Sequence, residues 1–172
     1  MRELKNERCP ICHTKNLILI EEEKDILYFG KFYLMSMTCD NCKYHVSDVE
    51  CAENKGPVKY TFVVKNKDDL NVRVVKSSEA TIKIPQLRMS VESGNSSIGY
   101  ISNIEGVLRR FKKILEDERD NAEDDNERKI AKNSLKKLWK VECGEEELKI
   151  IIEDETGNST IISDKVEVSK MK

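Results

Sequence analysis

Long apolar runs are missing from this sequence of 172 residues. Its uninterrupted apolar segments are only a few residues long, far short of the ~20 residues that a helix needs to cross a bilayer. The chain opens with the charged residues MRELKNER, which resemble neither a signal peptide nor a transit peptide. We therefore expect a soluble, cytoplasmic protein, in a compartment whose reducing conditions keep thiols free.

Histidine is also scarce, and this argues against a metalloenzyme. His13 and His45 are the only two histidines, whereas enzymes on cupin-like barrels usually hold their metal with two or three histidines and a carboxylate. The sequence contains no Walker loop, no Gly-x-Ser-x-Gly nucleophile elbow and no Cys–His nucleophile pair. We therefore expect that the protein is not an enzyme.

An excess of positive charge is absent as well. The 30 basic residues are balanced by 32 acidic ones, whereas a protein that grips a nucleic-acid backbone needs a clear basic excess. The segment 55–88 does contain eight basic and three acidic residues, so a zinc-ribbon protein that binds nucleic acid is kept as the alternative. Aromatic residues that could interleave with bases are few.

The cysteines form a pattern that predicts a metal site. Cys9 and Cys12 make one Cys-x-x-Cys knuckle, and Cys39 and Cys42 make a second knuckle after 26 intervening residues. Four thiolates can surround one tetrahedral Zn²⁺ and leave no open position for catalysis, so we predict one structural zinc ion. The alternative, four unrelated buried or disulfide-bonded cysteines, is disfavoured because paired knuckles rarely arise by chance. His13, beside Cys12, is expected to be a solvated knuckle residue.

The segments around these knuckles predict a zinc ribbon over residues 1–53. The first eight residues suggest a frayed start, and residues 17–39 suggest two or three strands with turns near 22–25 and at Gly30. A further strand is expected at 44–49. A module of about 50 residues buries too little apolar surface to fold without a staple, so zinc binding and folding should be one event. Cys51 and Cys143 have no knuckle partner and are expected to be ordinary thiols.

A second domain is predicted over residues 54–172, after the Gly-Pro pair at 56–57. Short alternating segments separated by polar turns favour a β-sandwich or barrel. A helical hairpin at about 104–140 interrupts them. The first helix has one apolar face, made of Ile104, Val107, Leu108, Phe111, Ile114 and Leu115. The second helix is indicated by the apolar residues Ile130, Ala131, Leu135, Leu138 and Trp139. Ser102 or Asn103 can cap the first helix. Residues 116–128, with eight carboxylates and two arginines, suggest a polar tip.

Several motifs together give a family resemblance. The two knuckles, the run VRVVKSSEATIKIP, the segment GYISNIEGVLRRF and the later IIIEDETGNS resemble the ZPR-type zinc-finger proteins in their single-module form. The resemblance covers nearly the whole chain. It implies a mainly β fold, namely a zinc ribbon followed by a double-stranded β-helix (jelly-roll-like) domain that carries the helical hairpin. It also implies association with translation elongation factor 1-alpha and a role in helping this GTPase to fold or mature.

The resemblance further marks candidate partner-binding residues in the R-V-V-K-S core and the G-N-S loop. They are Arg73, Lys76, Ser77, Ser78, Glu79, Gly157, Asn158 and Ser159. We expect them to be exposed at strand ends of one β-domain, where loops gather on a rigid scaffold. On physical grounds alone, they could equally be solvated strand and turn residues. The chain departs from the family pattern at Lys43, where Gly is usual, and at Glu155-Thr156, which replace a Pro-containing pair.

Overall fold

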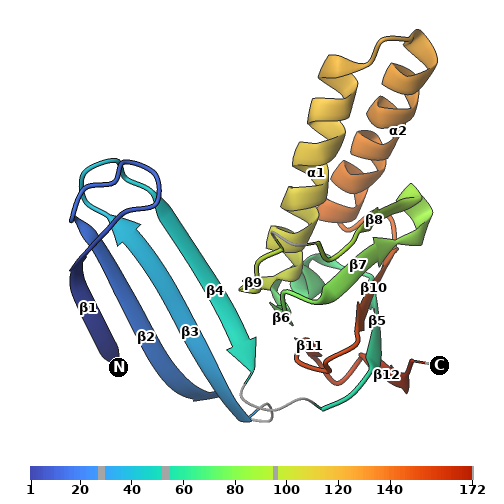
Figure 1. Ribbon diagram of the computed structural model, residues 1–172. Coiled ribbons are helices and arrows are strands. Elements are labelled where there is room, and N and C mark those ends of the chain that lie inside the picture. Colours follow the sequence, from blue (N-terminus) through green and yellow to red (C-terminus); the bar gives the residue numbers. More distant parts are fainter. Residues whose placement is uncertain (27–29, 52–54, 95–96, 172) are drawn as a thin grey trace.

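The structure is a computed structural model that describes residues 1–26, 30–51, 55–94 and 97–171. It is mainly β with two long helices, as predicted (Figure 1). In chain order the elements are β1 (Arg2–Glu7), β2 (Leu17–Ile26), β3 (Gly30–Cys39), β4 (His45–Cys51), β5 (Val58–Val64), the 3₁₀ helix η1 (Lys67–Asn71), β6 (Arg73–Lys76), β7 (Ala80–Ile84), η2 (Pro85–Leu87), β8 (Met89–Val91), β9 (Tyr100–Asn103), α1 (Ile104–Asn121), α2 (Asp125–Glu142), β10 (Leu148–Asp154), β11 (Thr160–Ile162) and β12 (Glu167–Lys170).

The four N-terminal strands form one antiparallel sheet in the order β1-β2-β3-β4. The register pairs Leu17 with Cys39 and Thr38 with His45, which brings both knuckles to the same end of the sheet. Two expectations are wrong here. The first residues are not frayed, because β1 pairs with β2, and β2 continues without a turn through residues 22–25. The charged run in β2 suggested a turn, but residues 21 and 23–25 are exposed within the strand, and exposed strand positions accept charges. Residues 27–29, before the expected turn at Gly30, lie outside the described residues.

The remaining strands form two sheets of the jelly-roll domain. One has the order β12-β5-β10-β7-β8, and the other has the order β11-β6-β9, so strands far apart in sequence become neighbours. Strand β10 is central: Leu148, Ile150 and Ile152 alternate into the core and are fully buried. The expectation of short strands separated by polar turns is confirmed, for example at β5, β6 and β7.

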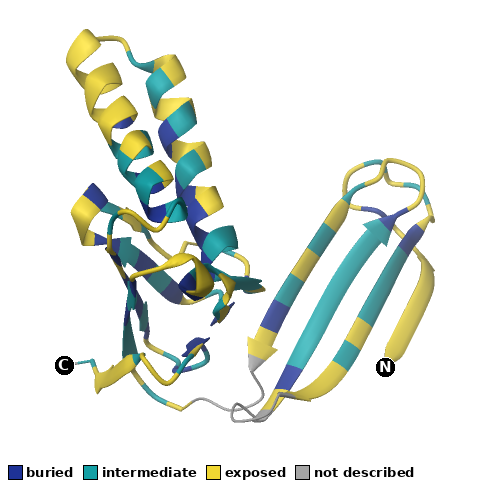
Figure 2. Ribbon diagram, turned by 180° about the vertical axis from the view of Figure 1, so that it is seen from behind, coloured by how far each residue is buried: buried dark blue, intermediate teal, exposed yellow. Residues whose placement is uncertain are grey.

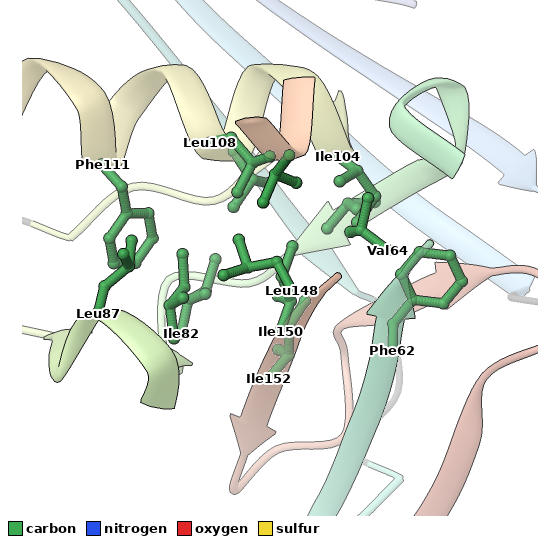
Figure 3. Packing of buried hydrophobic residues seen from close by; sticks show 14 of the residues in the cluster. Phe62, Val64, Ile82, Leu87, Ile104, Leu108, Phe111, Leu148, Ile150 and Ile152 are labelled. Atoms are coloured by element: carbon green, nitrogen blue, oxygen red, sulfur yellow. The ribbon is translucent and has the colours of Figure 1, made fainter. Parts of the chain in front are cut away.

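The helical hairpin stands on this domain and closes its core. Five of the six predicted apolar residues of α1 are buried, whereas Ile114 is 37% exposed. Figure 3 shows Leu108 and Phe111 pointing toward Ile82 and Leu148 of the sheet. Asn103 caps α1 as expected, because its side chain accepts a hydrogen bond of 2.8 Å from the Gly106 amide.

The outer part of the hairpin differs from the expectation. The acidic segment is not a loop tip, because α1 extends to Asn121 and α2 already begins at Asp125, capped by Asp124. The first carboxylates of the run lie in the last turns of α1, and the last ones lie at the start of α2, where a helix N-terminus favours negative charge. Ile130 and Trp139 are 59% and 53% exposed, so the apolar stripe of α2 is narrower than predicted (Figure 2).

The ribbon meets the jelly-roll domain at its edge strand β4. One carboxylate oxygen of Asp48, Oδ1, accepts hydrogen bonds from the Gly99 amide at 2.6 Å and from the Val49 amide at 2.8 Å. Phe32 and Val49 of the ribbon pack against Val75 of β6. A Cβ on Gly99 would collide with the Val49 carbonyl, so only glycine allows this close approach.

Candidate functional site

The two knuckles share one backbone conformation. In each, the amide after the second cysteine donates to the carbonyl of the first cysteine, from His13 to Cys9 and from Lys43 to Cys39, both at 3.0 Å. This turn places His13 and Lys43 in the left-handed region, with φ of 59° and 60°. Glycine adopts that region without a steric cost, which is the physical reason for its usual presence at the position of Lys43. The knuckle therefore keeps its shape with Lys43, at some cost in strain.

The four knuckle thiols lie together as a tetrahedral site requires. All four Sγ atoms are within 4.8 Å of one another, and the Sγ atoms of Cys9 and Cys42 are 3.7 Å apart. Those of Cys12 and Cys39 are 3.6 Å apart. With zinc–sulfur bonds of about 2.3 Å, a regular tetrahedron needs sulfur–sulfur distances of roughly 3.8 Å. The site therefore fits one zinc ion, and exposed His13 is outside the cluster of candidate ligands in the described chain.

Hydrogen bonds prepare some of these thiols for ionisation but not all. The Thr14 hydroxyl, 3.2 Å from Cys12 Sγ, and the Thr14 backbone lower the pKa of Cys12 to about 5. The Tyr44 amide lowers the pKa of Cys42, but burial and the hydrogen bonds with the other three thiols outweigh it and raise this pKa to about 12. Four neighbouring thiolates need a cation to offset their charge. A bound zinc ion would supply two positive charges and hold all four as ligands.

A second polar cluster surrounds Asp154, which ends β10 inside the jelly-roll domain. This carboxylate has no exposed surface. Its Oδ2 accepts from the hydroxyls of Ser77 at 2.7 Å and Ser159 at 2.5 Å. Its Oδ1 accepts from the Thr156 hydroxyl at 2.7 Å, the Thr156 amide at 2.8 Å and the Gly157 amide at 3.1 Å. Burial raises the pKa of Asp154, but these hydrogen bonds outweigh it and lower the pKa below its usual range.

The Asp154 cluster joins the two motifs that the sequence singled out. The Ser77 amide also donates to the Ser159 hydroxyl at 2.9 Å, so the end of the R-V-V-K-S core is fixed to the G-N-S loop. Gly157 has φ of 72° and lies against the backbone of residues 55–56, where a side chain would collide. The Oδ1 atom of Asn158 is buried without a hydrogen-bond partner among the described residues.

The structure corrects the expectation that all these residues are exposed. Lys76, Ser77 and Ser159 are 3%, 6% and 1% exposed, because their polar atoms satisfy one another inside the fold. Ser78 is half-buried and Glu79 is exposed, in the turn between β6 and β7. Arg73 is exposed but lies at the opposite end of β6. The structure thus unites residues 76–79 with 157–159 and leaves Arg73 apart.

Sequence reasoning missed Asp154 itself, although a signal was present. Leu148, Ile150 and Ile152 alternate on the inward face of β10, and Asp154 continues that alternation. A carboxylate at an inward position must have compensating donors, and the nearby serines and threonine supply them. Of the two cysteines outside the knuckles, Cys143 is a half-buried free thiol, whereas the Cys51 side chain is outside the described part of the structure.

A zinc ribbon with a four-cysteine site, followed by a jelly roll with an inserted helical hairpin, defines a class of zinc-finger protein. The family model of the ZPR1 jelly-roll domain matches residues 68–172. A ZPR1-like protein of Methanocaldococcus jannaschii is 36% identical over 168 residues, which cover 97% of this chain and 85% of that protein. The chain therefore belongs to the ZPR1 family, as its motifs predicted.

Two further relatives extend the comparison. A ZPR1-like protein of Pyrococcus horikoshii is 35% identical over 175 residues, covering 99% of this chain and 78% of that protein. The zinc finger chaperone zpr1 of Schizosaccharomyces pombe is 31% identical over 140 residues, which cover 79% of this chain but 30% of the yeast protein. The longer relative thus contains much that this chain does not match. No helix in the described parts of the chain is both long and apolar enough to span a membrane.

Proposed function

We propose that this protein binds translation elongation factor 1-alpha and assists its folding or maturation, with the zinc ion holding the ribbon folded. The single observation that supports a binding role best is the Asp154 cluster, which fixes two loops of separate sequence motifs into one rigid end of the jelly roll. Rigid loops on a β-scaffold are a common basis for protein recognition. The partner comes from the resemblance to ZPR-type proteins, and the name of the yeast relative, a chaperone, agrees with such a role.

At this end Glu79 is exposed and Ser78 and Asn158 are half-buried, and we assign the partner contact to these three residues. The same surface is supported from the interior of the domain by the buried residues Lys76, Ser77, Gly157 and Ser159. Arg73 would contact the partner only if the interface extends along β6. We place the protein in the cytoplasm, where the elongation factor works, and propose domain bounds of 1–53 and 54–172.

The alternative role in binding nucleic acid has less support. Two of the basic residues in the segment 55–88, Lys59 and Lys83, form ion pairs with Glu153 at 3.1 and 2.5 Å. Their charge is therefore partly neutralised within the sheet. The basic segment therefore offers less free positive charge to phosphates than its composition suggests.

Direct binding of purified, zinc-loaded protein to purified elongation factor 1-alpha tests the proposal. We expect binding whose affinity changes between the GDP-bound, GTP-bound and nucleotide-free factor. We also expect a higher yield of nucleotide-binding factor when it refolds from denaturant in the presence of this protein. Equal refolding yields with and without the protein, together with no binding to any form of the factor, would refute the proposal.

A charge reversal locates the interface. Glu79→Arg should weaken binding at least about tenfold, equivalent to ~1.4 kcal/mol, while zinc content and Tm stay unchanged. Glu147→Arg is the matched control, because exposed Glu147 precedes β10, at the opposite end of this strand from Asp154. If both variants bind as tightly as the unmodified protein, the contact is elsewhere on the molecule.

A further inference from the structure

A hollow of about 430 Å³ lies between α1 and the strands beside it. Its walls combine apolar side chains, including Ile82, Ile98 and Phe111, with cationic ones. The cations are Lys76, Arg110 and Lys113, and they outnumber the one carboxylate of the wall, Asp117. A neighbouring hollow of about 460 Å³ shares Ile98, Tyr100 and Arg110 and reaches residues 45–47 of the zinc ribbon. The combined surface therefore spans the junction of ribbon and jelly roll.

The three cations of this hollow have no carboxylate partner within ion-pair distance among the described residues. The Nζ atom of Lys76 donates to the Ser77 carbonyl at 2.9 Å and to the Ser97 hydroxyl at 3.4 Å. The Arg110 guanidinium donates to the Gly106 carbonyl at 3.1 Å. These bonds involve neutral oxygens. The charges of Asp154, Glu79 and Asp48 act on Lys76 from a distance, but none of them forms an ion pair with it.

Such charges are costly where water is excluded. Lys76 is 3% exposed, and a buried cation is unfavourable unless an anion pairs with it. Burial lowers the pKa of Lys76, which is the sign of that cost, and it outweighs the opposite effect of the charges of Asp154, Glu79 and Asp48. A carboxylate that enters the hollow would offset this cost at Lys76 and could also pair with the exposed Arg110.

The aromatic ring in the hollow organises Arg110 for this task. The Arg110 guanidinium lies 3.9 Å from the centre of the Tyr100 ring, and Lys76 Nζ lies 5.9 Å from the same centre. Stacking holds the planar guanidinium in one orientation, and the N–H groups that do not donate to Gly106 can donate to a carboxylate. The same stacking covers a face of the ring that a nucleic-acid base would need.

We propose that this hollow binds a Glu or Asp side chain of a peptide segment, together with an adjoining apolar side chain that packs on its apolar wall. The inference rests on the proposed function in taking the partner to be a protein. The opposite signs of charge select the acidic residue, and Ile98 and Ile114, which are 41% and 37% exposed, select the apolar one. The net charge of −2 disfavours a polyanion such as RNA as the occupant.

A pair of probe peptides tests the hollow directly. Acetyl-Leu-Glu-Leu-amide and its Gln counterpart are titrated into the zinc-loaded protein, and NMR signals of the Tyr100 ring and Ile98 methyl groups are followed. We expect the Glu peptide to bind at least tenfold more tightly than the Gln peptide. Arg110→Gln and Lys113→Gln should each remove most of this preference. Equal binding of the two peptides, or no shift at these signals, would overturn the inference.

Arg109→Gln is the matched control. It removes the same charge one position earlier on α1, but Arg109 forms an ion pair with Glu105 at 2.8 Å and does not line this hollow. It should retain the preference for Glu. If it loses the preference as Arg110→Gln does, the effect comes from the general field of the helix and the inference fails. Inorganic phosphate and an RNA oligonucleotide are tested as competitors of the bound Glu peptide. If either one displaces it at a lower concentration than added Glu peptide does, the inference is also overturned.

Elongation factor 1-alpha separates this inference from the proposed function. If the Glu peptide binds as expected but the factor does not bind at all, the hollow is supported and the proposed partner is wrong. If the factor binds the unmodified protein and Arg110→Gln equally, and the two peptides bind alike, the proposed function stands and the hollow is not its contact. Weaker binding of the factor to Arg110→Gln, with no change for Arg109→Gln, supports both.

Discussion

Replacing Asp154 by Asn tests whether the buried carboxylate holds the two loops together. The substitution keeps the shape of the side chain but removes its charge and one of its two acceptor oxygens. Asp154 accepts bonds from Ser77, Thr156, Gly157 and Ser159, and an amide can accept at one side only. Hydrogen bonds to a charged group are worth about 1.5–3 kcal/mol each, and the two serine hydroxyls can rotate to accept from the new amide. We therefore expect a loss of about 3 kcal/mol.

Urea denaturation followed by far-UV circular dichroism measures this loss. For a chain of this size, ~3 kcal/mol corresponds to a decrease in Tm of roughly 6–12 °C. The slope of the free energy of unfolding against urea should stay constant, because the same surface is exposed on unfolding. Glu155→Gln is the control: it removes one charge from the next residue, which is exposed, and should change stability by less than about 0.5 kcal/mol.

The pH dependence gives an independent check. The folded-state pKa of Asp154 is lowered relative to an unfolded value of about 3.9, so its contribution is present above pH ~4 and is lost as the pH falls through the folded-state pKa. Asp69 and Glu153 also have lowered pKa values and contribute in the same range. When the pH is lowered from about 5 to about 3, the Asn variant should therefore lose less stability than the unmodified protein loses. Equal stability and equal acid sensitivity of the two proteins would refute the reasoning.

Three further perturbations test the metal site and the core. Cys39→Ser should lose bound zinc and unfold the ribbon, whereas Cys143→Ser should retain one zinc per chain, as measured by elemental analysis. If both variants retain zinc, the four-cysteine site is contradicted. Phe111→Ala should lower the free energy of unfolding, measured by urea denaturation, by about 3–5 kcal/mol, because Phe111 is 1% exposed in the core. A decrease below about 1.5 kcal/mol would mean that α1 packs less closely on the sheet. Lys43→Gly should stabilise the zinc-loaded protein by roughly 1 kcal/mol, since φ is 60° there, and a destabilised variant would show that the left-handed turn carries no strain.

The zinc site, the class of fold and α1 could be predicted because each has a local signal. The paired knuckles specify four thiols, and the apolar repeat from Ile104 to Leu115 specifies one helix face. The outer turns of the hairpin had no such signal, since charged residues at 116–128 are compatible with both a loop and an exposed helix. The N-cap at Asp124 decides in favour of the helix.

The candidate binding residues could be located but their burial could not be predicted. The motif around Lys76 and Ser77 is polar, and polar residues between two strands are usually exposed. Their burial depends on Asp154 and Ser159, which lie 77 and 82 residues after Ser77 in the sequence. A pairing between such distant segments follows from the strand order of the jelly roll, which no short stretch of sequence encodes.

Strand β1 has a further consequence for how the molecule behaves among its own copies. A four-stranded sheet offers two edges whose free amides and carbonyls can recruit strands of other molecules. The β4 edge lies against the jelly-roll domain, as the bond from Gly99 to Asp48 shows. No strand in the described part of the chain pairs with the outer edge of β1. Its residues RELKNE are exposed and mostly charged, and its pairing with β2 shifts between Leu4 and Glu7, where Asn6 has φ of 62°. Charges and a bulge on an outer strand both oppose edge-to-edge growth, so β1 protects the long ribbon sheet from self-association.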